Sequence, residues 1–132
     1  MNINWEKGKP LPNAKAAKID LQKFTEYSMK PDNPQNQGKW MGFAMLGYLV
    51  ETTEGRRIAA QDIVRQLSKA LPYATAHRGK NNAYGIRFKV KIEVEGFNAR
   101  TGDLITIWQI DRDAAIPRLI TNWLEVHNQR RF

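Results

Sequence analysis

Residues 84–95 constrain the fold more than any other part of the chain, because they alternate strictly in polarity. The apolar positions are Ile86, Phe88, Val90, Ile92 and Val94, and the charged positions between them are Arg87, Lys89, Lys91 and Glu93. A period of two places the first set on one face of a β-strand and the second set on the other. The segment is therefore predicted to be a strand with one face to bury and one cationic face.

Two further strands are predicted to follow. Residues 98–103 have the composition of a turn, and residues 104–111 return the chain as an apolar strand. A third strand is predicted at residues 117–123. Together these segments indicate a twisted antiparallel sheet.

Helices are predicted ahead of the sheet, at residues 20–29, 39–46 and 58–71. Asp20 is suited to begin the first, Gly47 to end the second, and Pro72 stops the third. Residues 30–38 and 52–55 are expected to be a loop and a turn, and residues 73–82 a short strand and a polar loop. Residues 1–12 are predicted to be an extended arm and residues 125–132 a basic tail. The chain is thus predicted to be a single α+β domain spanning residues 1–132, with N-terminal helices packed on a three- to four-stranded antiparallel sheet.

The charge of the chain favours a polyanionic partner. Its formal net charge is +8, and residues 63–92 contain no Asp or Glu. The cations of that stretch are Arg65, Lys69, Arg78, Lys80, Arg87, Lys89 and Lys91. The alternative is a charged surface that serves only solubility. No stretch approaches the roughly 20 apolar residues of a membrane-spanning helix, so no membrane partner is expected.

Several common kinds of site are not indicated. The chain has no cysteine and two histidines, which argues against a zinc site, and it has no Gly-rich phosphate-binding loop. Asp111 and Asp113 are carboxylates of the kind that bind a divalent cation, but at the end of a strand they are more typical of turns that cap the backbone. No cofactor and no metal are therefore predicted.

A cationic face with hydroxyl groups suits a phosphodiester, and RNA can be cleaved without a metal when its 2′-hydroxyl is the nucleophile. His77 is the candidate acid–base catalyst, because imidazole is the side chain best suited to proton transfer near neutral pH. The other candidates fall into groups by role: Arg87, Lys89 and Arg118 for phosphate charge, Tyr84 and Thr106 for hydrogen bonds to phosphate, and Trp108 for stacking on a base. Further predicted RNA contacts are Arg78, Lys80 and Lys91.

Each candidate also has a structural explanation. His77 can be a solvated imidazole, and Arg118 can pair with Asp111 or Asp113. Trp108 shares a strand face with apolar residues and can pack in the core.

Several motifs, in this order and spacing, resemble those of a known family. They are Leu11-Pro-Asn13; Tyr27 with Pro31-Asp-Asn-Pro34, Lys39 and Leu46-Gly-Tyr48; Tyr84-Gly-Ile-Arg-Phe88; Thr106-Ile-Trp-Gln-Ile-Asp111; and Ile116-Pro-Arg-Leu-Ile-Thr121. Over about residues 11–123 the chain resembles small bacterial domains of unknown function that occur alone and as C-terminal toxin domains of haemagglutinin-like, contact-dependent-inhibition proteins.

The resemblance implies a ribonuclease toxin similar to the barnase, EndoU, colicin and RelE group, which cuts RNA, often tRNA, without a metal. It implies action in the bacterial cytoplasm, sometimes after delivery from another cell. It also implies neutralisation by a cognate acidic immunity protein or antitoxin. Two residues of the shared motifs then have expected roles. Lys39 is expected to stabilise the transition state, and Thr121 is expected to contact RNA.

The chain departs from the family pattern at three positions. Asn33, Asn36 and Ile105 stand where the pattern has His, Gly and Arg. If the protein is a ribonuclease, His77, Tyr84 or a neutral Lys39 must act as the base. The alternative is a non-catalytic basic module that binds nucleic acid or an acidic protein.

Overall fold

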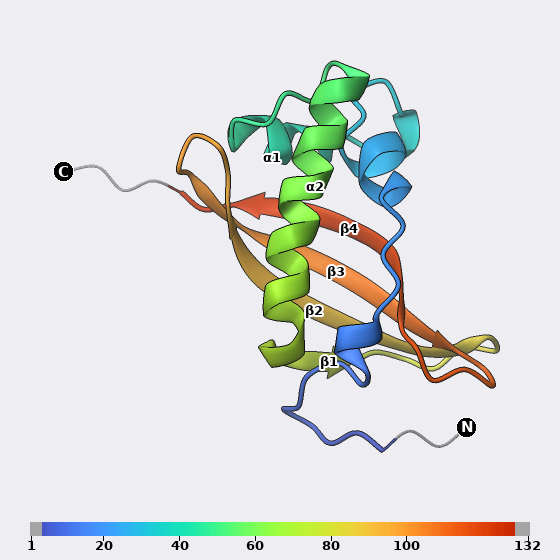
Figure 1. The fold of residues 1–132 in the computed structure, drawn as a ribbon. Coiled ribbons are helices and arrows are strands. Elements are labelled where there is room, and N and C mark those ends of the chain that lie inside the picture. The colour runs from blue at the N-terminus through green and yellow to red at the C-terminus, as the bar shows by residue number, and fades with distance from the viewer. Residues whose placement is uncertain (1–3, 129–132) are drawn as a thin grey trace.

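The computed structural model describes residues 4–128 and contains a four-stranded antiparallel sheet, which confirms the predicted α+β class (Figure 1). The strands follow the sheet order β1-β2-β3-β4 and are β1 (Ala76–Arg78), β2 (Gly85–Glu95), β3 (Thr101–Asp111) and β4 (Arg118–Val126). The last strand is longer than predicted, so residues 125 and 126 belong to the sheet and not to a tail. Residues 129–132 of the predicted tail lie outside the described residues.

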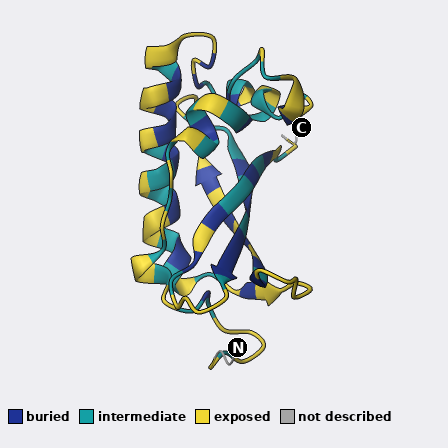
Figure 2. Ribbon diagram, turned by 90° about the vertical axis from the view of Figure 1, so that its right-hand side faces the viewer, coloured by how far each residue is buried: buried dark blue, intermediate teal, exposed yellow. Residues whose placement is uncertain are grey.

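The helix α2 (Thr53–Ala70) lies along one face of the sheet (Figures 1 and 2). It begins five residues earlier than the sequence suggested, because Thr52 caps it. The Thr52 hydroxyl accepts a hydrogen bond of 2.9 Å from the backbone N–H of Gly55, which satisfies a donor of the first turn. The predicted turn at residues 52–55 is therefore the start of the helix.

The N-terminal helical segments are short. The π-helix η2 (Lys23–Ser28) replaces the α-helix predicted at residues 20–29, and α1 (Trp40–Met45) agrees with the helix predicted at residues 39–46. Gly47 ends α1 with φ at 89°, a backbone conformation that favours glycine. Three 3-10 turns complete the set: η1 (Ala14–Ala16), η3 (Pro34–Asn36) and η4 (Leu71–Tyr73).

The hydrophobic core lies between the sheet and the helices. Phe24, Phe43, Ile63 and Trp108, contributed by η2, α1, α2 and β3, are each completely buried. The segment before η1 also packs on the sheet, since the Trp5 ring meets the Phe88 ring edge-on at 5.2 Å. None of the helices within residues 4–128 is long and apolar enough to cross a membrane.

The opposite face of the sheet is called here the open face. Figure 2 shows α2 on one side of the sheet and no helix over the lower part of the other side. The alternation of β2 confirms the prediction for this strand, because its apolar residues are buried and Lys89, Lys91 and Glu93 are exposed. The central strand β3 is buried on both sides: even Ile105, on the open face, is only 2% exposed.

Candidate functional site

The strand register brings cations from separate strands into rows across the open face. Residues paired directly across neighbouring strands lie about 5 Å apart. Three successive rows on this face are Arg87–Gln109–Arg118, then His77–Lys89–Ile107–Thr121, then Lys91–Ile105–Trp123. The sheet therefore gathers Arg87, Lys89, Lys91 and Arg118 on one surface.

The first row is fixed by hydrogen bonds between its side chains, called here the Gln109 network. The Arg87 Nε donates to Gln109 Oε1 at 2.8 Å, and Gln109 Nε2 donates to Asp111 Oδ1 at 2.7 Å. Arg118 then donates to both carboxylate oxygens of Asp111, at 2.7 and 3.1 Å. A bidentate pair of this kind fixes the orientation of the guanidinium. Arg87 and Arg118 are thus held on either side of Gln109, which is only 2% exposed.

The Gln109 network makes the stability of the fold depend on pH. Hydrogen bonds from Arg118 and Gln109 lower the pKa of Asp111 below its ordinary value of 3.8. A carboxyl group with a lowered pKa in the folded state adds stability above that ordinary value, and the contribution is lost as pH falls through the folded-state pKa. We expect Asp111→Asn to lose less stability on acidification than the unmodified protein, by about 1 kcal/mol or less for a pair this exposed.

Urea denaturation at neutral pH and near pH 3 measures this difference. Asp113→Asn is the matched control, because Asp113 is an exposed turn residue two positions away. Equal acid sensitivity of Asp111→Asn and the unmodified protein would contradict the assignment.

A second group of side chains meets at the β4 edge of the open face and is called here the lysine–tyrosine cluster. The Lys39 ammonium donates to the Tyr27 hydroxyl at 2.8 Å and lies 3.5 Å from the Thr121 hydroxyl. It also lies 5.5 Å from the centre of the Trp123 ring, within the range of a cation–π contact. All four side chains are partly exposed, so a bound ligand can reach them.

The cluster changes the acidity of the Tyr27 phenol. Partial burial by itself raises its pKa, but hydrogen bonding with Lys39 and Thr121 and the positive charges of Lys39 and Lys23 outweigh that effect. The net result is a pKa below the ordinary 10.0. A phenol beside an ammonium group is a suitable proton acceptor and donor.

The π-helix η2 is attached to β4 by a buried polar contact that fixes the position of Tyr27. The Ser28 hydroxyl donates to Asn122 Oδ1 at 2.7 Å, and Asn122 Nδ2 donates to the backbone carbonyl of Lys23 at 3.1 Å. Ser28 and Asn122 are completely buried. Because each end of the helix is bonded to the same strand residue, Tyr27 has a defined position relative to Thr121.

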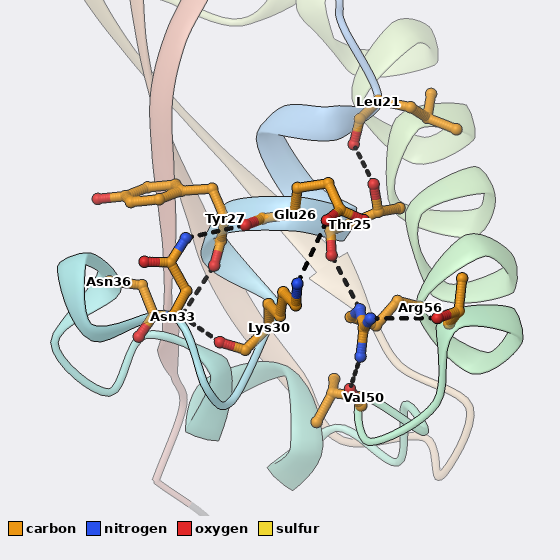
Figure 3. Close-up of polar contacts among 10 residues, drawn as sticks. Leu21, Thr25, Glu26, Tyr27, Lys30, Asn33, Asn36, Val50 and Arg56 are labelled. Carbon is orange, nitrogen blue, oxygen red and sulfur yellow. Dashed lines mark hydrogen bonds and ion pairs between the residues drawn. The ribbon is translucent and has the colours of Figure 1, made fainter.

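Two asparagines hold the loop before Lys39 against the same helix (Figure 3). Asn33 Nδ2 donates to the carbonyl of Glu26 at 2.9 Å, and Asn36 Nδ2 donates to the carbonyl of Tyr27 at 2.8 Å. Figure 3 also shows Arg56 on the other side of η2, where its Nε donates to the carbonyl of Thr25 at 2.8 Å. Asn33 and Asn36 therefore close the end of the helix.

A comparison with protein families found one that spans almost the whole described chain. It is described as a domain of unknown function, DUF6883, and matches residues 10–126. The chain belongs to this family. No curated protein and no solved structure matches it. The matched residues of the DUF6883 domain include the whole lysine–tyrosine cluster and the Gln109 network.

Of the three residues predicted as the base, the structure places Lys39 in the lysine–tyrosine cluster and His77 and Tyr84 away from it. His77 lies on β1, at the opposite edge of the sheet from Thr121. Tyr84 is 75% exposed, just before β2. Arg78 and Lys80 lie at the β1 end and in the loop that follows, where Arg78 donates to Asn81 at 3.3 Å. The DUF6883 domain thus does not assemble His77, Tyr84 and Lys39 in one place.

Two predicted site residues are corrected by the structure. Thr106 and Trp108 are each 0% exposed and point into the core. The Trp108 Nε1 donates to the Thr106 hydroxyl at 2.7 Å, and that hydroxyl donates to the carbonyl of Val90 at 2.8 Å. Since both side chains are enclosed and hydrogen-bonded to each other, neither is available to RNA.

Sequence reasoning assigned no role to Tyr27, Trp123 or Gln109. Tyr27 was visible only as part of a motif, and its partner Lys39 is twelve residues away across a loop. Gln109 lies in an apolar strand, where a single amide side chain does not indicate a functional role. Within residues 4–128, no three His, Asp or Glu side chains gather where they could hold a metal ion.

Proposed function

We propose that this domain is an endoribonuclease that binds RNA along the open face and cleaves it at the lysine–tyrosine cluster. The observation that carries the proposal is the Lys39–Tyr27 contact of 2.8 Å next to the Thr121 hydroxyl, at the edge of a cationic sheet face. The Tyr27 pKa is lowered, which favours proton transfer nearer neutral pH. Lys39 supplies the positive charge that a crowded phosphate needs in the transition state.

The proposed reaction uses the 2′-hydroxyl of RNA as the nucleophile and needs no metal. Ionised Tyr27 accepts the proton of the 2′-hydroxyl while the 2′-oxygen forms a bond to phosphorus. The bond from phosphorus to the 5′-oxygen breaks, and Lys39 donates a proton to the departing oxygen. Thr121 donates a hydrogen bond to a phosphate oxygen. The products are a 2′,3′-cyclic phosphate and a free 5′-hydroxyl.

The remaining cations of the open face are proposed to bind the RNA backbone on either side of the cleaved bond. Arg87 and Arg118 are oriented by the Gln109 network, and Arg118 keeps 45% of its side chain exposed. Lys89 and Lys91 are exposed in the neighbouring rows. Contacts with phosphates supply affinity without sequence preference and weaken as salt is added.

The resemblance to toxin domains and the net charge of +8 support a proposal for the cellular role. We propose a toxin that acts on RNA, including tRNA, in the bacterial cytoplasm. A cognate acidic immunity protein or antitoxin would neutralise it by covering the open face. Toxicity on expression, with rescue by a small acidic protein encoded next to it, tests this part of the proposal.

The alternative is a non-catalytic basic module that binds nucleic acid or an acidic protein. It is favoured by the position of His77 at the far edge of the sheet and by the pairing of Arg118 with Asp111. It predicts RNA binding with a steep dependence on salt and no cleavage products.

The direct test is to incubate the purified protein with total tRNA in EDTA at several pH values. We expect cleavage to become faster as pH rises toward the lowered pKa of Tyr27, because the ionised phenol is the base. Tyr27→Phe removes the phenol and is expected to slow cleavage by about 100-fold or more and to flatten the pH profile. Retention of both rate and pH profile in Tyr27→Phe would rule out this phenol as the base.

A further inference from the structure

Two pockets adjoin the lysine–tyrosine cluster. The first has a volume of about 420 Å³, and Tyr27 and Thr121 form part of its wall. The second has a volume of about 430 Å³, and Lys39 and Trp123 form part of its wall. Because Lys39 contacts both Tyr27 and Thr121, the two pockets meet at the cluster. Each is within the size range of about 300–1,000 Å³ that is typical of small-ligand sites.

We propose that the two pockets are nucleoside subsites on either side of the cleaved phosphate, and that the first prefers guanine while the second accepts any base. This inference rests on the proposed function and adds the substrate preference of the same site. The preference is inferred from the residues that line the two pockets, which are different.

The wall of the first pocket carries two carboxylates and two side chains with N–H donors. Asp20 and Glu26 provide the carboxylates, and Gln22 and Lys23 provide N–H donors. An ionised carboxylate only accepts hydrogen bonds. Among the four bases, guanine alone presents two adjacent N–H donors on its pairing edge, so one carboxylate can bind both. The carbonyl oxygen beside those donors suits Lys23.

Glu26 is the more available of the two carboxylates for this contact, because Asp20 Oδ1 already accepts a hydrogen bond of 2.9 Å from the backbone N–H of Gln22. The backbone carbonyl of Glu26 is held by Asn33 at 2.9 Å, so the backbone there is fixed. Its side chain pairs with Lys30 at 3.4 Å and remains 51% exposed. An exposed pair of this kind is worth about 1 kcal/mol or less, so a guanine can replace or share it.

The second pocket is suited to stacking. The Trp123 ring forms one wall, and Gly42 and Leu124 form others. Every base has a π-face, so stacking on an indole does not distinguish one base from another. The Lys39 ammonium near the ring places positive charge next to the phosphate that joins the two nucleosides.

The test uses 2′-O-methyl dinucleotides, which cannot be cleaved because the nucleophilic hydroxyl is blocked. GpU, UpG and UpU are titrated into the protein, and binding is followed by NMR chemical-shift changes. We expect one of the two guanine-containing dinucleotides to bind about tenfold more tightly than UpU. Glu26→Gln is expected to remove this preference. Glu93→Gln, which changes an exposed carboxylate elsewhere on the open face, is the matched control and should keep it.

Trp123→Ala tests the second pocket. It is expected to weaken all three dinucleotides by about tenfold while leaving the guanine preference intact. Equal binding of the three dinucleotides, absence of binding, or an unchanged preference in Glu26→Gln would overturn the inference. Because these ligands are not cleaved, the result is separate from catalysis. Guanine-selective binding without cleavage of unmodified RNA would leave the subsites standing and remove the proposed ribonuclease.

Discussion

Lys39→Met is expected to lower the rate of RNA cleavage by about 100-fold to 10,000-fold, the range associated with loss of an acid–base group or of a key electrostatic contact. The substitution removes the ammonium that contacts Tyr27 at 2.8 Å. It therefore removes two contributions together: the charge that lowers the Tyr27 pKa and the proposed proton donor for the 5′-oxygen. Initial rates on tRNA, measured with RNA below saturation, give the change.

Lys69→Met is the matched control for this substitution. Lys69 is an exposed cation in the last turn of α2, on the helical side of the sheet, so its loss changes the net charge equally without touching the open face. We expect near-normal cleavage. Thermal denaturation of both variants checks that each is folded. If folded Lys39→Met cleaved as fast as Lys69→Met, Lys39 would have no part in the chemistry.

Trp108→Ala is expected to destabilise the fold by about 3–5 kcal/mol. The side chain is completely buried and lies between Phe88 of β2 and Leu119 of β4 in the sheet register. Removing it opens a cavity among side chains that cannot close around it. It also removes the donor to the Thr106 hydroxyl. Domains of this size have a total stability of about 5–15 kcal/mol, so urea denaturation should show a large shift of the midpoint.

Trp123→Ala provides the comparison for stability. Trp123 belongs to the open face and is partly exposed, so the same truncation leaves no enclosed cavity and should cost about 1 kcal/mol or less. Trp108→Phe keeps an aromatic ring but loses the indole N–H and part of the side-chain volume, so its cost should fall between the two. Similar losses for Trp108→Ala and Trp123→Ala would contradict the assignment of the two faces.

The sheet could be predicted from the sequence because its signal is local. The alternation in β2 assigned each residue to a face before any partner strand was known, and the structure confirms it. The central strand was harder to interpret. β3 is apolar on both faces, with Ile105 on one and Trp108 on the other both buried. Alternation cannot identify the exposed side of such a strand, so it does not separate contacts of Thr106 and Trp108 with RNA from packing of these residues in the core.

The Gln109 network depends on the register of the strands, which the sequence does not reveal. Arg87, Gln109 and Arg118 come from three strands, and no spacing along the chain indicates that they lie in one row. The pairing that aligns them is set by packing of the opposite, buried face. A shift of one residue would have turned every side chain of a strand to the other side.

By itself, the sequence determined the order of helices and strands, the cationic face of β2 and the helix end at Gly47, because each depends on neighbours within a few residues. Only the tertiary structure decided where Tyr27 lies. Its helix is bonded in the wider π pattern, so its side chains point in other directions than those of an α-helix. Two distant contacts, to Asn122 and to the loop of Asn33 and Asn36, hold it in place. Lys39 and Tyr27 are partners because folding brings that loop back across the edge of β4. The contact is maintained by the folding free energy of the whole core, to which no short segment of the sequence corresponds.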